Sequence, residues 1–380
     1  MHRFWSTIIE PVLEVLQPGT IVEIGASEGT NTANLLEFCE RHVATLHAIE
    51  PLPKFDVASY QQRHDERFVF HHALSLDAIP AIDRFDAVLI DGDHNWYTVY
   101  NELKLIEKIC AASSQPFPLV MLHDIGWPYG RRDLYYNPED IPGAFRKPYD
   151  QRGMLPGSPH LVARGGLNPH LFNAERENDL QSGVLTAAED FLSETEQKLE
   201  LVELPGLNGF ALLFLMQVKE KKPAMAPLLQ DFDLTPFARK YVDLIEEVRV
   251  HTEILRLERI SALKSTLKSE IEKRSNIIEQ QTASLKKQSR DIDRLVRWID
   301  ELDLGISALL NSWRWRCGNA IGEIRRKLLS RPKVPMASDH LLKIMRQVNR
   351  WKKHYKQGKD QSLSQRYVHP AGDPNLVAGG

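Results

Sequence analysis

The stretch Val22-Glu-Ile-Gly-Ala-Ser-Glu-Gly-Thr30 decides the fold of this chain. Its apolar start, with residues 20–24, predicts a short buried strand, and the Gly25-x-x-x-Gly29 spacing predicts a tight turn before a helix over 32–41. Glycines let the backbone approach a ligand closely, and a helix N-terminus offers free N–H groups. A ligand is therefore expected at this turn.

The charge around the turn indicates which ligand it would bind. A dinucleotide-binding loop more often has the pattern G-x-G-x-x-G. Here Glu23 and Glu28 flank the glycines, and their negative charge disfavours a diphosphate but suits a cationic sulfonium that carries an amino group. We therefore expect S-adenosylmethionine, bound in part by Glu23, Gly25, Ala26, Ser27 and Gly29. The alternative is an ordinary strand–turn–helix without a ligand.

Two further strands, over 45–50 and 68–72, add candidate cofactor contacts. Glu50 ends the first of them about 20 residues after the glycine turn, where a carboxylate can accept hydrogen bonds from both ribose hydroxyls. Leu74 follows the other, where the adenine ring is expected. For Glu50 the alternative is a helix-capping or surface role.

The order of the predicted elements gives the fold class. Apolar runs over 85–91 and 119–123 predict two more strands, separated by a helix over 97–111. Strands that alternate with helices imply βαβ units and a parallel sheet. After a helix over 183–198, residues 199–204 and 209–216 predict a strand pair. We expect an α/β fold with a Rossmann-like, doubly wound, mostly parallel sheet, a C-terminal antiparallel strand pair, and then a long α-helical coiled coil.

Acidic and histidine residues follow the last two parallel strands. The motif Asp91-Gly-Asp-His-Asn-Trp-Tyr97 follows one strand, and His123-Asp124 ends the next. Open α/β sheets bind ligands at this edge, so Asp91, His123 and Asp124 are predicted to bind a divalent cation such as Mg²⁺. His94 is the predicted general base, and Asp91 is also expected to contact the cofactor. The alternative is that Asp91 and Asp93 cap the next helix.

Residues 125–178 are rich in Pro, Gly, Tyr and Arg and are expected to form loops. A long loop of this kind is often a functional lid. Aromatic faces stack on sugar rings, and arginines bind anionic groups. The predicted substrate lid consists of Tyr129, Arg131, Arg132, Tyr135 and Tyr136, and its alternative is ordinary loop composition.

A heptad pattern begins near Tyr241. Its a positions hold Leu257, Ile271, Ile278, Leu285, Ile292, Ile299 and Ile306, and its d positions include Ile260, Leu267, Leu295, Leu302 and Leu309. Isoleucine at a with leucine at d favours a parallel dimer. The alternative is one long helix packed on its own domain. The expected domains are 1–220 for the cofactor fold, 221–240 for a linker, 241–311 for the coiled coil and 312–380 for a basic amphipathic, partly disordered tail.

The charges are divided unevenly along the chain. Residues 312–360 hold 14 Lys or Arg against three acidic residues, a charge of +11, so the remainder carries −14. Trp313, Trp315, Ile321, Ile324 and Leu328 suit contact with lipid, which suggests an anionic membrane surface, although a solvated helix fits equally well. Nucleic acid is the less favoured partner. Only Cys39, Cys110 and Cys317 occur, which suggests a reducing, cytoplasmic location without disulfides, and no apolar run suits a membrane span.

Taken together, residues 8–218 resemble class I S-adenosylmethionine-dependent methyltransferases. The motifs E-I-G-x-x-x-G and D-G-D-H, with the later His123-Asp124, are similar to those of metal-dependent sugar O-methyltransferases. The resemblance implies that Asp91 and Asp124 are metal ligands and that His94 is the base. In this chain one carboxylate of the usual acidic pair is replaced by imidazole. The Ser312-Trp-Arg-Trp-Arg segment after a coiled coil resembles proteins of bacterial surface-polysaccharide assembly.

The resemblance implies methylation of a sugar hydroxyl on a glycan or lipid-linked sugar, by a parallel homodimer near the inner face of the cell membrane. Two alternatives are methylation of a small-metabolite hydroxyl and a non-catalytic scaffold that organises glycan-assembly enzymes.

Overall fold

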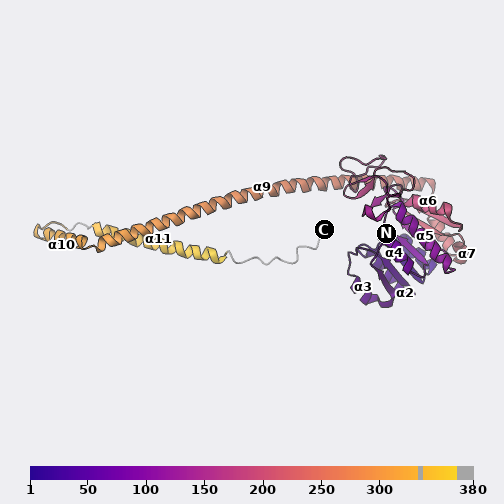
Figure 1. Cartoon of the computed structure of the whole chain (residues 1–380), viewed down its shortest axis with the longest axis horizontal. Coiled ribbons are helices and arrows are strands. Elements are labelled where there is room, and N and C mark those ends of the chain that lie inside the picture. Colours follow the sequence, from indigo (N-terminus) through magenta and orange to yellow (C-terminus); the bar gives the residue numbers. More distant parts are fainter. Residues whose placement is uncertain (333–336, 366–380) are drawn as a thin grey trace. The chain divides into compact units, whose positions relative to one another are not determined.

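Figure 1 shows the computed structural model of the chain, which describes residues 1–332 and 337–365. The chain divides into two compact units, Met1–Ser265 and Thr266–Gly380, and each is described by itself. Within the described ranges, no helix is both long enough and apolar enough to cross a membrane.

The first unit is built on a sheet that has seven strands within the described residues. Their order is β3-β2-β1-β4-β5-β10-β9, in which the first five strands are parallel and β10 is antiparallel to both β5 and β9. The strands are β1 (Thr20–Ile24), β2 (Thr45–Ile49), β3 (Phe68–His71), β4 (Ala87–Ile90), β5 (Leu119–His123), β9 (Leu199–Leu204) and β10 (Phe210–Leu215). The predicted fold class is confirmed.

Helices cover both faces of this sheet, which explains why its central strands are apolar throughout. Side chains alternate along each strand, so Ile21 of β1 joins one core cluster and Val22 joins the other. The first cluster includes Val12 of α1 and Leu35 of α2, and the second includes side chains of α5 and α6. A doubly covered parallel sheet of this kind requires continuous apolar strands.

Three helices of the first unit, over 30–42, 96–112 and 184–194, lie close to their predicted positions, whereas the short helices over 57–64, 75–78, 218–221 and 225–231 were not predicted. An insertion, residues 125–182, divides these helices into two groups. The helices before it are α1 (Glu10–Leu16), α2 (Thr30–His42), α3 (Val57–His64), α4 (Ser75–Ala78) and α5 (Trp96–Ala112). Those after it are α6 (Val184–Glu194), α7 (Val218–Lys221) and α8 (Met225–Asp231). Met225 and Leu229 of α8 are buried in the core, so this part of the expected linker packs on the sheet.

Residues 125–182 contain a second, smaller sheet where loops were expected. Its strands are β6 (Leu134–Tyr135), β7 (Tyr149–Asp150) and β8 (Phe172–Ala174), in the order β6-β8-β7. Asn173 of β8 is buried, and its side-chain amide donates to the carbonyls of Arg152 and Asn168, both at 2.9 Å. The expectation of loops alone was wrong. The sequence did not indicate these strands because they are two or three residues long and lack a clear alternation of apolar and polar residues.

The predicted substrate lid needs correction in the same segment. Arg132 and Tyr135 are fully buried, and the Arg132 guanidinium donates to the carbonyl of Ala174 at 2.5 Å. Arg131 pairs instead with Glu189 of α6. These three side chains have partners within the protein, whereas Tyr136 is 58% exposed. Tyr129 is buried as well, and its hydroxyl donates to Asn173 Oδ1 at 3.1 Å, so Tyr136 is the most exposed of the predicted lid residues.

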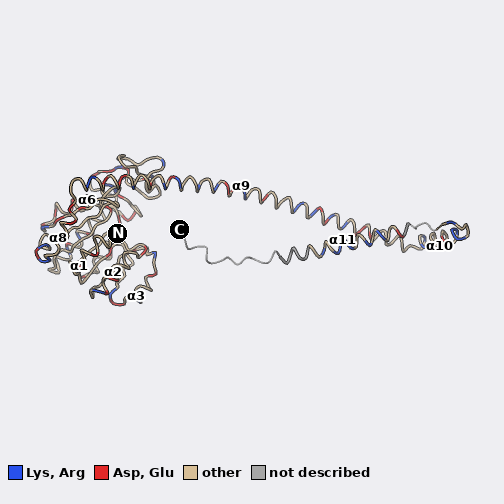
Figure 2. Tube along the Cα trace, turned by 180° about the vertical axis from the view of Figure 1, so that it is seen from behind, with Lys and Arg blue, Asp and Glu red and all other residues tan. Residues whose placement is uncertain are grey.

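The second unit contains the rest of α9 (Pro236–Asn311), which begins in the first unit, followed by α10 (Trp313–Leu328) and α11 (Ala337–Gln365). Ser312 separates α9 from α10, and its hydroxyl accepts a hydrogen bond from the amide of Trp315 at 3.2 Å. Figure 2 shows α11 beside α9, where Lys352 pairs with Asp300 at 2.6 Å and Tyr355 donates to Asp293 at 3.3 Å. The helices α9 and α11 are therefore antiparallel.

The second unit bears on the predicted coiled coil and tail. Residues 241–311 form one helix, and the heptad residues Ile271, Ile278 and Leu285 are exposed in the single chain. Dimer formation remains a prediction. The tail is helical over 313–328 and 337–365. Residues 333–336 and 366–380 of the tail lie outside the described residues, so the partial disorder expected for the tail remains a prediction.

The buried carboxylate of Asp133 ties the insertion to the main sheet. It accepts the amide of Trp96, at the start of α5, and the amide of Gly183, just before α6, both at 2.7 Å. The Tyr135 hydroxyl donates to it at 2.9 Å. Both helix N-termini therefore depend on one negative charge.

Asp133→Ala should lower the free energy of unfolding of the first unit by about 3 kcal/mol, because buried donors lose their acceptor. Denaturant titration followed by near-UV circular dichroism measures the change. The matched control is Asp231→Ala, at an exposed position, which should change stability little. Equal stability of the two variants would contradict the role of Asp133.

Candidate functional site

The glycine turn after β1 is shaped by the backbone of the loop after β4. Gly25 has φ +93°, and a Cβ atom there would lie 2.3 Å from the carbonyl oxygen of Asp91. Gly29 has φ +75° and precedes α2. Both positions therefore require glycine, and the turn brings the helix N-terminus to the carboxyl edge of the sheet.

Glu23, in β1, stabilises this turn through hydrogen bonds to α2. The side chain is 2% exposed, and it accepts hydrogen bonds from Asn31 Nδ2 at 2.8 Å and Thr32 Oγ1 at 2.6 Å. Burial raises the pKa of Glu23 to about 7, although both hydrogen bonds oppose this rise. The structure thus places Glu23 between β1 and the first turn of α2, where it holds the glycine turn in place.

Glu50 lies at the end of β2 and faces the same turn. Its Oε2 accepts the amide of Ser27 at 2.8 Å, and its Oε1 accepts the amide of Leu52 at 2.9 Å. The carboxylate is only partly buried, so it remains open to a ligand. Leu74, after β3, is 44% exposed. Apart from Glu23, which lies within β1, the predicted cofactor residues follow β1, β2, β3 and β4, at one edge of the sheet.

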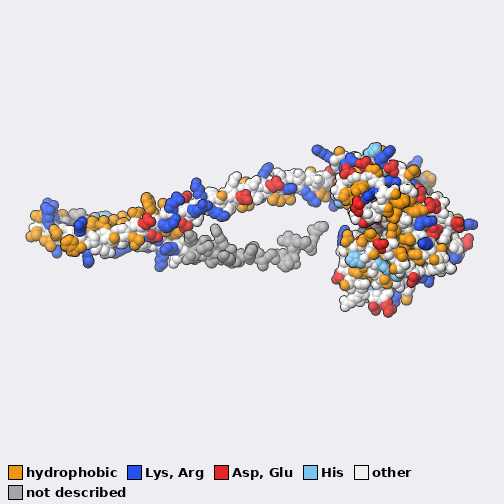
Figure 3. Space-filling model, in the orientation of Figure 1, with side chains coloured by type: hydrophobic (Ala, Val, Ile, Leu, Met, Phe, Trp, Pro, Cys, Tyr) orange, Lys and Arg blue, Asp and Glu red, His pale blue; other side chains and the backbone are white. Residues whose placement is uncertain are grey.

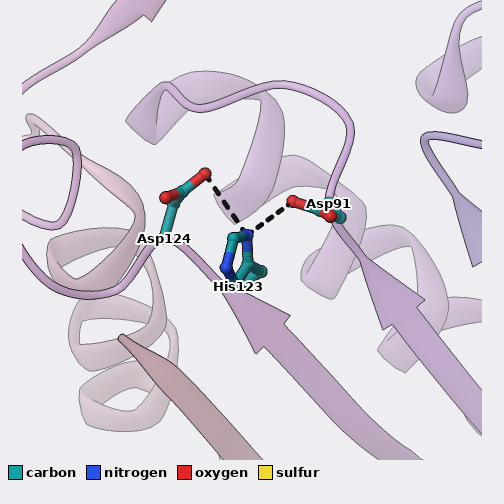
Figure 4. A group of neighbouring side chains, drawn as sticks. All are labelled: Asp91, His123 and Asp124. Atoms are coloured by element: carbon teal, nitrogen blue, oxygen red, sulfur yellow. Dashed lines mark hydrogen bonds and ion pairs between the residues drawn. The ribbon is translucent and has the colours of Figure 1, made fainter. Parts of the chain in front are cut away.

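Four titratable side chains meet beside this turn, at the ends of β4 and β5. His123 Nδ1 lies 2.9 Å from Asp91 Oδ1 and 3.4 Å from Asp124 Oδ2, as Figure 4 shows. His94 Nε2 pairs closely with Asp124 Oδ2 and lies 3.9 Å from Asp91 Oδ1. The predicted base and the predicted metal ligands are therefore neighbours.

Hydrogen bonds orient both histidine rings. His123 Nε2 donates to the carbonyl of Leu207 at 3.2 Å. His94 Nδ1 donates to the carbonyl of Gly92 at 3.0 Å, which leaves Nε2 directed toward the carboxylates. Tyr129 and Tyr136 stand edge-on to the His94 ring, with centroids at 5.7 and 6.0 Å. These contacts fix which ring nitrogen can exchange a proton.

The pairing shifts the acidity of all four groups. Burial lowers the pKa of His123, but the hydrogen bonds and charges of Asp124 and Asp91 outweigh burial and raise it to about 10. The pKa of His94 is also raised, by Asp124 against burial. The nearby imidazoles hold the pKa values of Asp91 and Asp124 below their usual range despite burial. The carboxylates are therefore ionised at neutral pH.

The cluster has the donor set of a divalent cation site. Asp91, His123 and Asp124 each offer one ligand atom, and these atoms lie within 4.8 Å of one another. Asp124 Oδ1 is buried without a hydrogen-bond partner, and Asp124 has φ +59°, an unusual conformation for a residue other than glycine. Two carboxylates and an imidazole suit a divalent cation, which would replace the proton on the coordinating nitrogen.

Sequence reasoning missed several neighbours of the cluster. The Met1 ammonium group pairs with Asp91 Oδ2 at 2.7 Å, and Phe4 packs edge-on against His123 with centroids at 5.5 Å. The Leu207 carbonyl is a backbone atom, so no residue type indicates its role. The adjacent Pro205-Gly-Leu-Asn208 turn was visible in the sequence, but its contact with β5 was not.

Comparison with known proteins shows that the segment containing these residues matches a family model. Residues 22–125 match a family model described as a methyltransferase domain. Over this part, the chain is similar to methyltransferase domains. The match spans the glycine turn, Glu50 and the whole Asp91–Asp124 cluster. It confirms the predicted enzyme class, a methyltransferase.

Two solved structures are similar to part of the chain at low identity. An SAH-bound methyltransferase from Podospora anserina is 12% identical, covering 55% of this chain and 79% of that one, with a TM-score of 0.34. A 1,6-didemethyltoxoflavin-N1-methyltransferase from Burkholderia thailandensis, with bound 1,6-didemethyltoxoflavin and S-adenosylhomocysteine, is 15% identical, covering 56% and 76%, with a TM-score of 0.32. None of the curated proteins compared with the chain matches it.

Proposed function

We propose that the chain is an S-adenosylmethionine-dependent O-methyltransferase whose acceptor is a sugar hydroxyl. The observation that carries the proposal is the Asp91–His94–His123–Asp124 cluster beside the glycine turn. It combines a base with carboxylates at the edge where the family places methyl transfer. Nitrogen acceptors need less help with deprotonation, so a base of this kind favours an oxygen acceptor.

The cofactor would lie over the glycine turn. The backbone of residues 25–29 allows close approach, and Glu50 can accept hydrogen bonds from the two ribose hydroxyls while Leu74 contacts the adenine ring. Glu28, Asp91 and the ionised fraction of Glu23 supply negative charge for the sulfonium and ammonium groups. A cationic cofactor fits this charge better than a diphosphate does.

His94 would accept the proton of the acceptor hydroxyl at Nε2 when its ring is neutral, with the hydroxyl taking the place of the contact that Nε2 makes with Asp124 Oδ2 in this structure. The Nδ1–H bond to Gly92 holds the base tautomer, and the Asp124 carboxylate stabilises the imidazolium that forms. The hydroxyl oxygen then bonds to the methyl carbon as the carbon–sulfur bond breaks, and its electrons stay on the sulfur of S-adenosylhomocysteine. A divalent cation held by Asp91, His123 and Asp124 would lower the pKa of the acceptor hydroxyl and orient it.

The sugar acceptor and a role in bacterial surface-polysaccharide synthesis rest on the resemblance of the sequence motifs. The exposed ring of Tyr136, next to His94, supports the choice because aromatic faces stack on sugar rings. A small-metabolite hydroxyl is the alternative acceptor. A scaffold without activity is a third possibility, and it is distinguished by the lack of cofactor binding.

The partners proposed for the second unit are a second copy of the chain and an anionic lipid surface. The exposed heptad residues of α9 suit a parallel homodimer. On α10, the exposed side chains of Trp313, Ile321, Ile324 and Leu328 follow a helical repeat and are flanked by basic residues, and Figure 3 shows hydrophobic and basic side chains close together at α10. Apolar contact combined with arginine and lysine suits anionic headgroups.

Glu50→Ala should weaken S-adenosylmethionine binding about 10-fold or more, since hydrogen bonds to a charged acceptor are worth about 1.5–3 kcal/mol. Isothermal titration calorimetry measures the dissociation constant. Glu37→Ala, an exposed position on α2, is the matched control and should bind as the unaltered chain does. If the unaltered chain binds no cofactor, the scaffold alternative replaces the enzyme.

His94→Ala should lower kcat by roughly 10²–10⁴-fold without changing the cofactor dissociation constant, because the variant loses its base. Transfer of labelled methyl groups to a panel of cell-envelope glycans measures the rate. His170→Ala, an exposed histidine, should retain full activity. Activity that survives EDTA unchanged would exclude the cation, and activity only on small hydroxyl compounds would favour the alternative acceptor.

Replacing Arg325, Arg326 and Lys327 of α10 by glutamine should reduce binding to phosphatidylglycerol vesicles at least about 10-fold at low salt, because each basic residue contributes about 1 kcal/mol. Co-sedimentation measures the bound fraction. The control makes the same three changes at the exposed Lys286, Lys287 and Arg290 of α9. Salt-sensitive binding to RNA without vesicle binding would overturn the lipid proposal.

A further inference from the structure

The turn between β9 and β10 has an unusual backbone. Gly206, Leu207, Asn208 and Gly209 all have positive φ, at +92°, +51°, +72° and +85°. Leucine is disfavoured in the left-handed region because of its Cβ atom, whereas glycine and asparagine adopt it more readily. Such a turn persists only where its surroundings hold it. The source of that support is α9.

Glu246 on α9 accepts hydrogen bonds from the two central residues of the turn. Its Oε2 accepts the amide of Leu207 at 3.0 Å, and its Oε1 accepts the amide of Asn208 at 2.9 Å. Arg249, one turn later, donates to both Glu246 oxygens at 2.7 Å and to Asn208 Oδ1 at 2.5 Å. Burial raises the pKa of Glu246, but the bonds from Arg249 and the two amides outweigh it and lower the pKa. The carboxylate is thus ionised.

The other side of the turn contacts the candidate active site. The Leu207 carbonyl accepts the hydrogen bond from His123 Nε2 at 3.2 Å. The Asn208 carbonyl accepts the amide of Gly126 at 2.6 Å, two residues after Asp124. The turn and the loop after β5 are in close contact here, since a Cβ atom on Gly209 would lie 2.4 Å from the Gly126 amide nitrogen. A shift of the turn would therefore move both the His123 ring and the loop after β5.

We propose that Glu246 is a positioning residue for the active site, which acts through Leu207 to fix the ring of His123 between Asp91 and Asp124. The inference rests on the proposed function. It means that the first turns of α9 complete the methyltransferase domain instead of merely extending from it. Partners that orient a ligand histidine commonly affect metal affinity or activity about 10–100-fold.

The docking of α9 does not itself require Glu246. Val250 and Ile254 are buried, and they lie on later turns of the same helix within the first unit. Burial of these two apolar side chains stabilises the packed helix independently of the Glu246 carboxylate. Removal of the Glu246 carboxylate should therefore release the turn while α9 stays packed.

The test compares Glu246→Ala with Glu247→Ala in the full chain. Glu247 is the adjacent acid and is exposed, and its side chain does not reach the turn in the hydrogen bonds described. We expect Glu246→Ala to lower kcat about 10-fold while KM for S-adenosylmethionine stays within about twofold, because the cofactor turn is untouched. Glu247→Ala should match the unaltered chain. Glu246→Gln, which retains one acceptor oxygen, should be intermediate.

A second readout is independent of catalysis. The ¹⁵N resonances of the His123 ring, assigned by their loss in His123→Gln, should shift in Glu246→Ala and stay unchanged in Glu247→Ala. If no acceptor is methylated by the unaltered chain, the proposed function fails while this measurement still tests the positioning role. Unchanged kcat together with unchanged His123 resonances would overturn the inference.

Arg249→Gln provides a second variant if Glu246→Ala does not fold. It removes the bond to Asn208 Oδ1 but leaves the Glu246 carboxylate on both amides, so the same changes should occur in smaller size. Near-UV circular dichroism should show native packing of the variant. A native Arg249→Gln variant with no change in kcat or in the His123 resonances would also overturn the inference.

Discussion

The close approach of Gly25 to the backbone of Asp91 is the constraint on which the rest of the site depends. β1 and β4 are neighbours in the sheet, and their following loops must diverge to opposite faces. No side chain fits between these loops, because a Cβ atom on Gly25 would overlap the Asp91 carbonyl oxygen. The same contact that shapes the glycine turn therefore sets the position of Asp91.

Asp91 belongs to a cluster with His94, His123 and Asp124, whose members are held together by pairs of opposite charge. Two carboxylates and two imidazoles share a small, mostly buried volume, and each ring is oriented by a backbone carbonyl on its other nitrogen. Burial would disfavour each charge alone, but the opposite charges stabilise one another. Such an arrangement can bind a cation or exchange a proton, because it already balances charge between close partners. The proposed methyl transfer uses this property.

The helix α9 begins in the first unit and ends in the second. The early turns of α9 hold the turn that contacts His123, and the later turns pair with α11. The heptad pattern predicted a helix over 241–311, and α9 covers these residues. The pattern is defined by the apolar residues alone. The contacts of Glu246 and Arg249 with the β9–β10 turn are polar and local, so a periodicity argument does not detect them.

The sequence by itself determined the sheet, the glycine turn and the residues that follow each parallel strand. Strand periodicity and the steric needs of glycine are local properties, and the carboxyl ends of parallel strands necessarily meet at one edge. Only the tertiary structure decided that Arg132 and Tyr135 are buried, that the insertion forms a sheet, and that a Leu207 carbonyl orients His123. These features arise from contacts between distant segments, often through backbone atoms that every residue type shares.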